Sequence, residues 1–267
     1  MVDIHCHILP GLDDGAQDMS ESIKMAHIAK EDGIQAIIAT PHIFRGTYNY
    51  DDLSIIEQKS IELAAVLDRY RIDIRLFTGA EVHLSHNLID EIRRHREHLT
   101  LANSSYMFVE FPSDHVFQGV KHLIFDLMSE GITPVIAHPE RNTVFIHHPE
   151  LLFELVTMGA LAQANAGSFT GLYGSESEAA VLSFLELNLI HFIATDGHNT
   201  RSMSPRLSEA CRKAADLVGE EQATALVSDN PRHIIENRDF FPAHEPINPA
   251  SHEKKLKIKL PRLFRRK

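Results

Sequence analysis

Residues 2–15 of the chain read VDIHCHILPGLDDG. The first few residues form a short run typical of a β-strand, and side chains along a strand point alternately to its two sides. This period of two places His5 and His7 on the same side and sends Cys6 to the other. Two imidazoles on one side of a strand can hold one metal ion. The stretch therefore predicts a ligand-bearing strand at the start of the fold.

Six further β-rich runs follow the first one, which covers residues 2–5. They lie at residues 35–40, 74–78, 106–111, 133–137, 161–164 and 191–195, and helical segments at residues 20–32, 53–70, 117–130, 149–158, 176–188 and 204–218 separate most of them. A repeated strand–helix order indicates an α/β fold with a parallel sheet, either a barrel or an open doubly wound sheet. We expect a distorted (β/α)7 TIM-like barrel, because polar residues follow nearly every strand and a barrel brings the carboxyl ends of its strands to one rim.

Imidazole and carboxylate side chains follow nearly every one of these runs. The set comprises His5, His7, Asp14, His42, Glu81, Glu110, His138, Asp196 and His198. One such residue at a strand end usually caps a turn or satisfies local structure. In a parallel barrel, however, the carboxyl ends of all strands meet at one rim. Nine residues at matching positions therefore indicate a metal cluster, and ligands without thiolate suit Zn, Mn or Fe.

The remaining reactive residue types exclude several classes of protein. Cys6 and Cys211 are too few for a disulfide framework, and neither has an arginine six residues later, as thiol-dependent tyrosine phosphatases require. We expect Cys6 to pack in the core. There is no GxxxxGK[ST] motif. His83 and His115 lie close to ligand-bearing segments and are candidates to line the same cleft.

Charge is distributed unevenly between the body of the chain and its C-terminus. Residues 254–267 hold eight Lys or Arg and no acid, and removing these eight charges from the net −11 leaves −19 for the rest. An acidic body argues against nucleic acid as a partner. We expect a domain over residues 1–240, followed by a proline-containing linker and basic tail over residues 241–267. The tail has the composition of a solvated segment, and the alternative hypothesis is a peripheral contact with an anionic membrane surface.

No apolar run approaches the roughly 20 residues that cross a bilayer, and the first two dozen residues lack the basic region of a secretory signal. With only two cysteines, the chain fits a reducing compartment. We therefore expect a cytoplasmic protein.

Several segments carry a resemblance to a known family. In order along residues 1–237 they are MVDIHCHILPGLDDGA, IIATPH, TGAEV, VEFP, PVIAHPER and IATDGHN. The chain resembles the bacterial protein-tyrosine phosphatases of the PHP (polymerase and histidinol phosphatase) superfamily, which act on the tyrosine kinases of capsule and exopolysaccharide synthesis. The resemblance implies a PHP domain, three divalent ions, usually manganese, and hydrolysis of phosphotyrosine on a phosphorylated bacterial tyrosine kinase.

The resemblance also implies roles for individual residues. One ion is held by His5, His7, Glu81 and Asp196, a second by Glu81, Glu110 and His138, and a third by Asp14, His42 and His198. Arg141 contacts the substrate phosphate, Asp196 is required for turnover, and His42 is the candidate to protonate the leaving group. Arg201 and Arg206 flank the expected place of a second phosphate-binding arginine, and neither coincides with it.

Three alternatives share the same ligand set. The first is a PHP phosphatase of a small phosphate monoester such as histidinol phosphate, and the second is a PHP exonuclease, which the acidic body disfavours. The third is a non-catalytic, metal-stabilised module that binds a kinase. The presence of all nine ligand types argues against the third.

Overall fold

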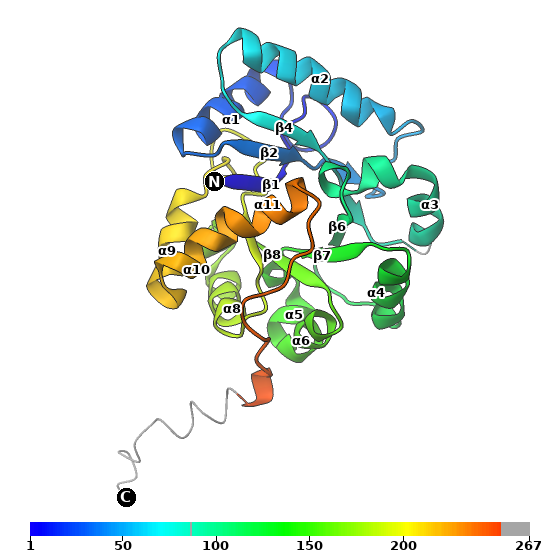
Figure 1. The fold of residues 1–267 in the computed structure, drawn as a ribbon, viewed down its shortest axis with the longest axis vertical. Coiled ribbons are helices and arrows are strands. Elements are labelled where there is room, and N and C mark those ends of the chain that lie inside the picture. Colours follow the sequence, from blue (N-terminus) through cyan, green and yellow to red (C-terminus); the bar gives the residue numbers. More distant parts are fainter. Residues whose placement is uncertain (86, 252–267) are drawn as a thin grey trace, which may run out of the picture.

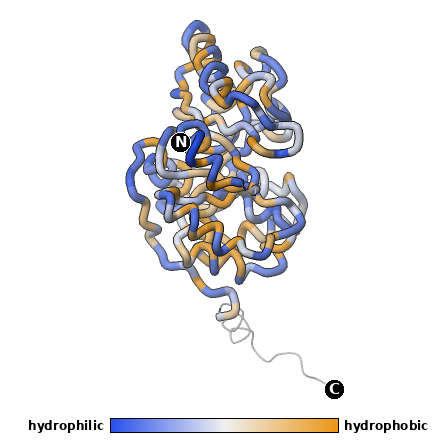
Figure 2. The backbone as a smooth tube through the Cα atoms, turned by 90° about the vertical axis from the view of Figure 1, so that its right-hand side faces the viewer, coloured by the Kyte–Doolittle hydropathy of each residue, from blue (hydrophilic) through white to orange (hydrophobic). Residues whose placement is uncertain are grey.

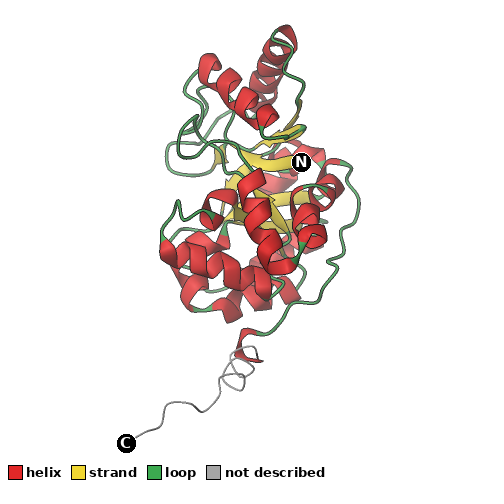
Figure 3. Cartoon of the chain, turned by 90° about the vertical axis from the view of Figure 1, so that its left-hand side faces the viewer, coloured by secondary structure: helices red, strands yellow, loops and turns green. Residues whose placement is uncertain are grey.

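Strands form the centre of the molecule and helices surround them (Figure 1, Figure 3). The computed structural model describes residues 1–85 and 87–251. Its strands are β1 (Val2–Cys6), β2 (Ala36–Ala39), β3 (His42–Ile43), β4 (Arg75–Thr78), β5 (Glu81–His83), β6 (Tyr106–Glu110), β7 (Thr133–Ala137), β8 (Leu161–Asn165) and β9 (Phe192–Ala194).

The helices lie between and after these strands. They are α1 (Met19–Glu31), α2 (Ser54–Arg69), α3 (Leu88–Leu99), α4 (Val120–Ser129), α5 (Thr143–His147), α6 (Pro149–Thr157), α7 (Ala166–Phe169), α8 (Ser175–Glu186), α9 (Ser208–Val218), α10 (Glu220–Val227) and α11 (Asp229–Ile235). The described residues also contain the 3-10 turns η1 (Leu101–Asn103) and η2 (Pro139–Arg141).

The strands pair in parallel and their neighbours run around a ring. One sheet has the order β1-β2-β4 and the other the order β3-β5-β6-β7-β8-β9. The chain passes directly from β2 into β3 and from β4 into β5, so the two sheets are continuous at that side. At the other side a parallel bridge joins Cys6 to Gly197, just after β9. The predicted α/β fold with parallel strands is confirmed, and the Cys6–Gly197 bridge lies where the predicted distorted barrel would close.

Each of two predicted strands, at residues 35–40 and 74–78, is followed after a break by a second short strand that the sequence pattern did not predict. Between β2 and β3 the break falls at Thr40 and Pro41, where proline has no N–H to donate to the ladder. Between β4 and β5 it falls at Gly79 and Ala80, and a side chain on Gly79 would approach Leu101 within 3.0 Å. The segments β3 and β5, which begin with His42 and Glu81, therefore pair separately, at the rim of the barrel.

A change of register inside β1 sets the direction of its histidines. Val2 and Ile4 pack in an inner cluster with alternate residues of the other strands, including Tyr106, Phe108, Val135, Phe192 and Ala194. Between Asp3 and Cys6 the pairing with β2 is irregular. Beyond this point His5 contacts Phe108 of the inner cluster, with ring centroids 4.6 Å apart. His5 and His7 thus face the interior, and the prediction that they lie on the same side is confirmed.

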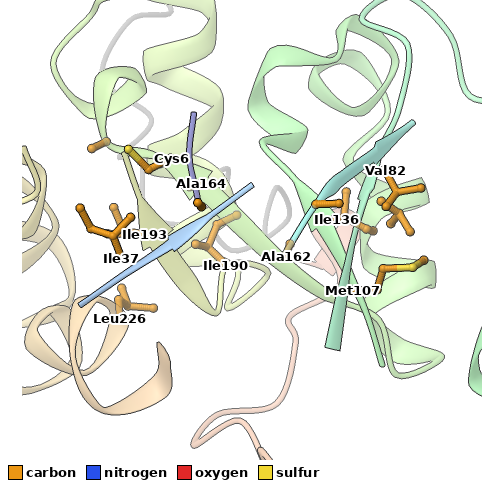
Figure 4. Close-up of a cluster of buried hydrophobic side chains, with 14 of the residues drawn as sticks. Cys6, Ile37, Val82, Met107, Ile136, Ala162, Ala164, Ile190, Ile193 and Leu226 are labelled. Carbon is orange, nitrogen blue, oxygen red and sulfur yellow. The ribbon is translucent and has the colours of Figure 1, made fainter. Parts of the chain in front are cut away.

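Cys6 points to the opposite side, into the hydrophobic layer between the barrel and its helices. Figure 4 shows it near Ile37, Ala164 and Ile193. Its side chain has no exposed surface, and burial raises the pKa of its thiol well above the usual value. The prediction that Cys6 packs in the core is confirmed.

The six predicted helical segments are all helical, as α1, α2, α4, α6, α8 and α9. Local sequence explains two of the boundaries: Asp18 accepts a hydrogen bond from the Glu21 N–H at 2.9 Å before α1, and Pro149 opens α6. The sequence pattern misses α3, α5, α7, α10 and α11. Half of the twelve residues of α3 are charged, and this helix buries only Leu88, Ile92 and Leu99. Figure 2 shows short hydrophilic and hydrophobic stretches alternating along the backbone.

The chain after α11 returns along the barrel as far as the structure describes it. The Ile247 N–H donates to the Leu187 carbonyl at 2.8 Å, and Ile247 packs against the core. The basic tail of residues 254–267, and with it the hypothesis of membrane contact, lies outside the described residues. Within the described part, none of the helices has both the length and the apolar composition that a membrane crossing requires.

Candidate metal centre

All nine predicted ligands lie at the rim formed by the carboxyl ends of the strands. Seven of them line a cleft of about 350 Å³, namely Asp14, His42, Glu81, Glu110, His138, Asp196 and His198. His5 and His7 lie buried, with 0% and 1% of their surface exposed, and their rings contact His138 and His42 of this group. Seven separate chain segments contribute to the cluster, because parallel barrel strands direct their carboxyl ends to one side.

The donor atoms fall into three overlapping groups, in each of which all donors lie within 4.8 Å of one another. The groups are His5, His7, Glu81 and Asp196; His7, Asp14, His42 and His198; and His42, Glu81 and Glu110. The first is the set that the family resemblance implies. The second adds His7 to an implied set, and the third contains His42 where the resemblance implies His138. His138 instead contacts Glu81, with its Nε2 2.8 Å from Oε1.

The first group has the spacing that a shared cation requires. The Nε2 atoms of His5 and His7 are 3.2 Å apart, and the Glu81 Oε2 lies 3.3 and 3.4 Å from them. The Asp196 Oδ1 lies 3.5 and 3.4 Å from the same two nitrogens. Four donors at about 2.0–2.1 Å from one tetrahedral ion stand about 3.3 Å from each other. Glu81 Oε2 is also buried without a hydrogen-bond partner. The residues present therefore fit a bound divalent ion.

Two residues that sequence reasoning did not select set the tautomers of these histidines. His5 Nδ1 is 2.8 Å from Gln163 Oε1, and His7 Nδ1 is 2.6 Å from Asp13 Oδ2. Gln163 Nε2 donates to Asn165 Oδ1 at 2.9 Å, so its oxygen faces His5 and accepts. Both histidines thus carry their proton on Nδ1 and turn an unprotonated Nε2 toward the other. Two facing lone pairs repel unless a cation lies between them.

The electrostatics of the cluster favour positive charge inside it. Burial acts to lower the pKa of His5, but the carboxylates of Glu81 and Asp196 outweigh it and raise that pKa to about 9, so these carboxylates favour a positive charge at Nε2, which either a proton or a metal ion can supply. Burial likewise opposes ionisation of Asp196, yet His5, His7 and His198 hold its pKa well below the usual value. The carboxylates therefore remain charged and attract a cation at neutral pH.

Two of the nine residues have a strained backbone. His138 follows β7 with φ 33°, and Asp196 follows β9 with φ 50°, both in the left-handed region. For residues other than glycine this conformation costs on the order of 1–3 kcal/mol and clusters at functional sites. Hydrogen bonds hold the Asp196 turn, because its N–H donates to the His5 carbonyl at 2.8 Å. The strain directs each side chain back over the rim.

Arg141 lies on the wall of the same cleft. Its guanidinium donates to Asp196 Oδ2 at 2.8 Å and stacks over the ring of Tyr173, with its central carbon 4.2 Å from the ring centroid. About a third of the side chain, 35%, is exposed. Asp196 also accepts from Asn165 Nδ2 at 2.6 Å. Arg141 is thus held in place while part of its surface faces the cleft.

The other candidates from the sequence lie in different places. His83 lines the cleft, with its Nδ1 3.2 Å from Glu110 Oε2. The His115 side chain is 61% exposed, pairs with Asp114 and is not among the residues that line the cleft. Arg201 is exposed and also does not line the cleft. Arg206 lines a separate cavity.

A search for polar strand ends could have found Gln163 and Asn165. They are the last polar residues of β8, two positions apart, in a strand that is otherwise apolar. Asp13 could not be told from Asp14 by position, because the two are adjacent.

The match to known proteins covers almost the whole chain. Residues 1–236 match the family model of capsular polysaccharide synthesis, CpsB/CapC. The chain belongs to this family. Over 254 residues it is 36% identical to the tyrosine-protein phosphatase YwqE of Bacillus subtilis, covering 95% of this chain and 98% of that protein. It is 29% identical over 240 residues to the tyrosine-protein phosphatase CpsB of Streptococcus pneumoniae, covering 88% and 98%.

Solved structures agree with the sequence match. One that is described as part of the crystal structures of YwqE and CpsB, unique metal-dependent tyrosine phosphatases, superposes with a TM-score of 0.88 at 36% identity. The superposition covers 93% of this chain and 99% of that one. The lactonase Lmo2620 of Listeria monocytogenes, at 15% identity and a TM-score of 0.50, shares the fold alone. The resemblance to PHP-type tyrosine phosphatases is confirmed at the level of the family.

Proposed function

We propose that this member of the CpsB/CapC family is a metal-dependent protein-tyrosine phosphatase that hydrolyses phosphotyrosine on a bacterial tyrosine kinase of capsule or exopolysaccharide synthesis. The observation that carries the proposal is the convergence of three overlapping ligand groups and Arg141 on one cleft. The names of its relatives as tyrosine-protein phosphatases support the substrate class.

The nine rim residues hold three divalent ions in this proposal, with manganese as the first choice and zinc or iron as alternatives. His42 and Glu81 each belong to two of the three groups, so they would be shared between neighbouring ions. Bound ions supply positive charge for the phosphate oxygens and lower the pKa of water enough to make hydroxide available at neutral pH.

The chain's own side chains bind and orient the phosphate. Arg141 presents a planar guanidinium, whose paired donors match phosphate oxygens, and its hydrogen bond to Asp196 fixes its direction. Asp196 therefore serves both the ligand cluster and the arginine. Asp13 and Gln163 keep the Nε2 atoms of His7 and His5 unprotonated and aimed into the cluster.

The tyrosyl leaving group needs little help from a proton donor of the protein. A tyrosyl oxygen has a pKa near 10, so it leaves as an anion more readily than an alkyl alcohol does. A dedicated proton donor is therefore not needed. His42 reaches the cleft and is the candidate for that role only if it is not bound to an ion. An alkyl phosphate such as histidinol phosphate would need such a donor more.

Hydrolysis of a phosphotyrosine peptide and of histidinol phosphate, side by side, tests this proposal. The full chain is stripped with a chelator and resupplied with Mn, Zn or Fe, and released phosphate is measured. We expect metal-dependent release from the peptide and its loss in Asp196→Ala. Activity on histidinol phosphate alone would assign the protein to another PHP branch, and turnover retained in Asp196→Ala would refute the metal mechanism.

We further propose that residues 1–240 form the catalytic domain and that the basic tail contacts anionic lipid headgroups. A chain ending at Pro249 keeps the Ile247 contact with the barrel, so it should hydrolyse the peptide like the full chain. It should sediment less with vesicles that contain phosphatidylserine, since each basic residue near such a surface contributes about 1 kcal/mol. Equal sedimentation of the two chains contradicts the tail's role.

A further inference from the structure

Arg45 is a second arginine of the metal-centre cleft, and no sequence motif points to it. It lies after β3 and lines the cleft together with Arg141. Its NH1 is 3.2 Å from Glu110 Oε1 and lies against the His42 ring. Arg141, in contrast, approaches from the segment after β7 and contacts Asp196. The two guanidinium groups therefore reach the ligand cluster from different strands.

A short hydrogen-bonded loop holds the backbone of Arg45. The Phe44 N–H donates to the Tyr48 carbonyl at 3.0 Å, and the Tyr48 N–H donates back to the Arg45 carbonyl at 2.9 Å. Phe44 and Gly46, on either side of Arg45, both have left-handed backbones, with φ 62° and 57°. Tyr50 ties the end of the loop to the carbonyl of Leu12. The loop thus directs Arg45 toward the rim.

The guanidinium of Arg45 is available to a ligand. Its side chain is 43% exposed, whereas the Glu110 and His42 side chains that it touches are only 6% and 3% exposed. Its fork of N–H donors suits the geometry of phosphate. Because it already contacts residues of two ligand groups, a phosphate held against those groups would be within hydrogen-bonding reach of it.

A negatively charged phosphate in this cleft is attracted by cationic side chains as well as by bound ions. A phosphate monoester carries up to two negative charges, and four carboxylates, from Asp14, Glu81, Glu110 and Asp196, line the same cleft. Among the described residues that line it, Arg45 and Arg141 are the arginines, and lysine is absent. Arg201 and Arg206, which flank the position expected from the family, lie outside it.

We propose that Arg45 is a phosphate-binding residue of this site, contacting a non-bridging oxygen of the substrate phosphate on the side of β3. This inference rests on the proposed phosphatase function and adds to it a second side chain that contacts the phosphate. No covalent step involves Arg45.

Binding of inorganic phosphate to the manganese-loaded full chain tests this inference independently of turnover. Isothermal titration calorimetry compares Arg45→Ala and Arg45→Lys with wild type, and Arg201→Ala and Arg206→Ala are matched controls. We expect Arg45→Ala to weaken phosphate binding at least tenfold at unchanged metal content, and Arg45→Lys to recover part of the loss. The two control variants should bind like wild type.

Steady-state kinetics on the phosphotyrosine peptide separate this role from a structural one. Loss of a phosphate contact should lower kcat/KM by about 10–100-fold in Arg45→Ala with the melting temperature unchanged. Wild-type phosphate affinity in Arg45→Ala would overturn the inference, and so would a loss that disappears once the metal content is restored. If wild type fails to hydrolyse the peptide while phosphate binding still depends on Arg45, the proposed function fails and the anion site stands.

Discussion

Asp13 and Asp14 are neighbours in the chain but serve the site in different ways. The Asp14 side chain is 48% exposed and faces His42 and His198 from the cleft, in the manner of a direct ligand. The Asp13 side chain is buried, and its Oδ2 accepts hydrogen bonds from His7 at 2.6 Å and from the His42 N–H at 3.0 Å. Its Oδ1 accepts from the Gly15 N–H at 2.9 Å. Asp13 is thus a positioning residue for two histidines.

Replacing Asp13 by Asn should weaken metal binding without removing a ligand. The charge of Asp13 raises the basicity of the His7 imidazole, and loss of such a partner typically lowers metal affinity 10–100-fold. Manganese titration by calorimetry measures the change. Asp216→Asn, at an exposed position of α9, should bind manganese like wild type. Unchanged affinity in Asp13→Asn would show that Asp13 only supports the loop.

Gly15 shows how closely this loop approaches β1. A Cβ at this position would lie 2.1 Å from the His7 carbonyl oxygen and 2.4 Å from the His7 Cβ. Backbone and Cβ atoms cannot move aside as a flexible side-chain end can, so only glycine fits here. The close approach places Asp13 within reach of the His7 ring.

At the scale of elements, His191 completes the pairing between β8 and the start of β9. Its N–H donates to the Ala162 carbonyl at 2.9 Å, and its Nδ1 accepts from the Ala162 N–H at 3.0 Å. Asn230, in α11, donates to its carbonyl at 2.8 Å. Burial disfavours the charged form of the ring and lowers the pKa of His191 to about 4. The ring is therefore neutral at pH 7, and its Nδ1 can accept the hydrogen bond from Ala162.

The pH dependence of stability should reflect this buried histidine. An unfolded histidine has a pKa near 6.5, so between pH 6.5 and about 4 the unfolded chain binds a proton that the folded chain does not. Stability therefore rises with pH in this window, and acidification from pH 6.5 to 4 removes about 3 kcal/mol from this group alone.

Comparison with His191→Asn isolates the effect, because asparagine keeps an acceptor for the Ala162 N–H and does not titrate there. Urea unfolding at several pH values between 4 and 7 should give the variant a flatter dependence than wild type. Parallel curves for the two chains would mean that His191 is protonated in the folded protein, or that its pKa is close to 6.5.

At the scale of the whole molecule, folding brings several carboxylates close together at the rim, where their charges repel one another. Glu81 and Asp196 are buried within 3.5 Å of the same two imidazole nitrogens, and Glu110 is nearby. Seven chain segments converge at this point. An ion bound there should therefore stabilise the entire barrel, because it binds the folded arrangement and not the separated segments.

Removal of metal should lower the melting temperature. One ion present at 100 times its Kd stabilises the fold by about 2.7 kcal/mol. For a chain of this size each kcal/mol corresponds to about 2–4 °C, so we expect a rise of at least about 5 °C when manganese is added to chelator-treated protein. Differential scanning calorimetry measures it. Asp196→Asn should show a smaller rise, and equal melting temperatures with chelator and with manganese would contradict a bound cluster.

Much of the fold and of the candidate site could be predicted because both depend on local periodicity. The strand and helix periods indicate seven strand units and six helices. The alternation of side chains along a strand places His5 and His7 on one side and Cys6 on the other. The rule that parallel strands end at one rim brings nine dispersed residues together without any knowledge of contacts. These inferences need only the chain's own order and spacing.

Folding in three dimensions decided what spacing could not. The irregular pairing in β1 between Asp3 and Cys6 depends on which residues of β2 lie opposite. The placement of Arg45 beside Glu110, and of Arg206 in another cavity, depends on loop geometry. Hydrogen bonds from His5 to Gln163 and from Asn165 to Asp196 link residues 158 and 31 positions apart. Periodicity describes neighbours along the chain, whereas partner choice and side-chain orientation are set by the packing of distant segments.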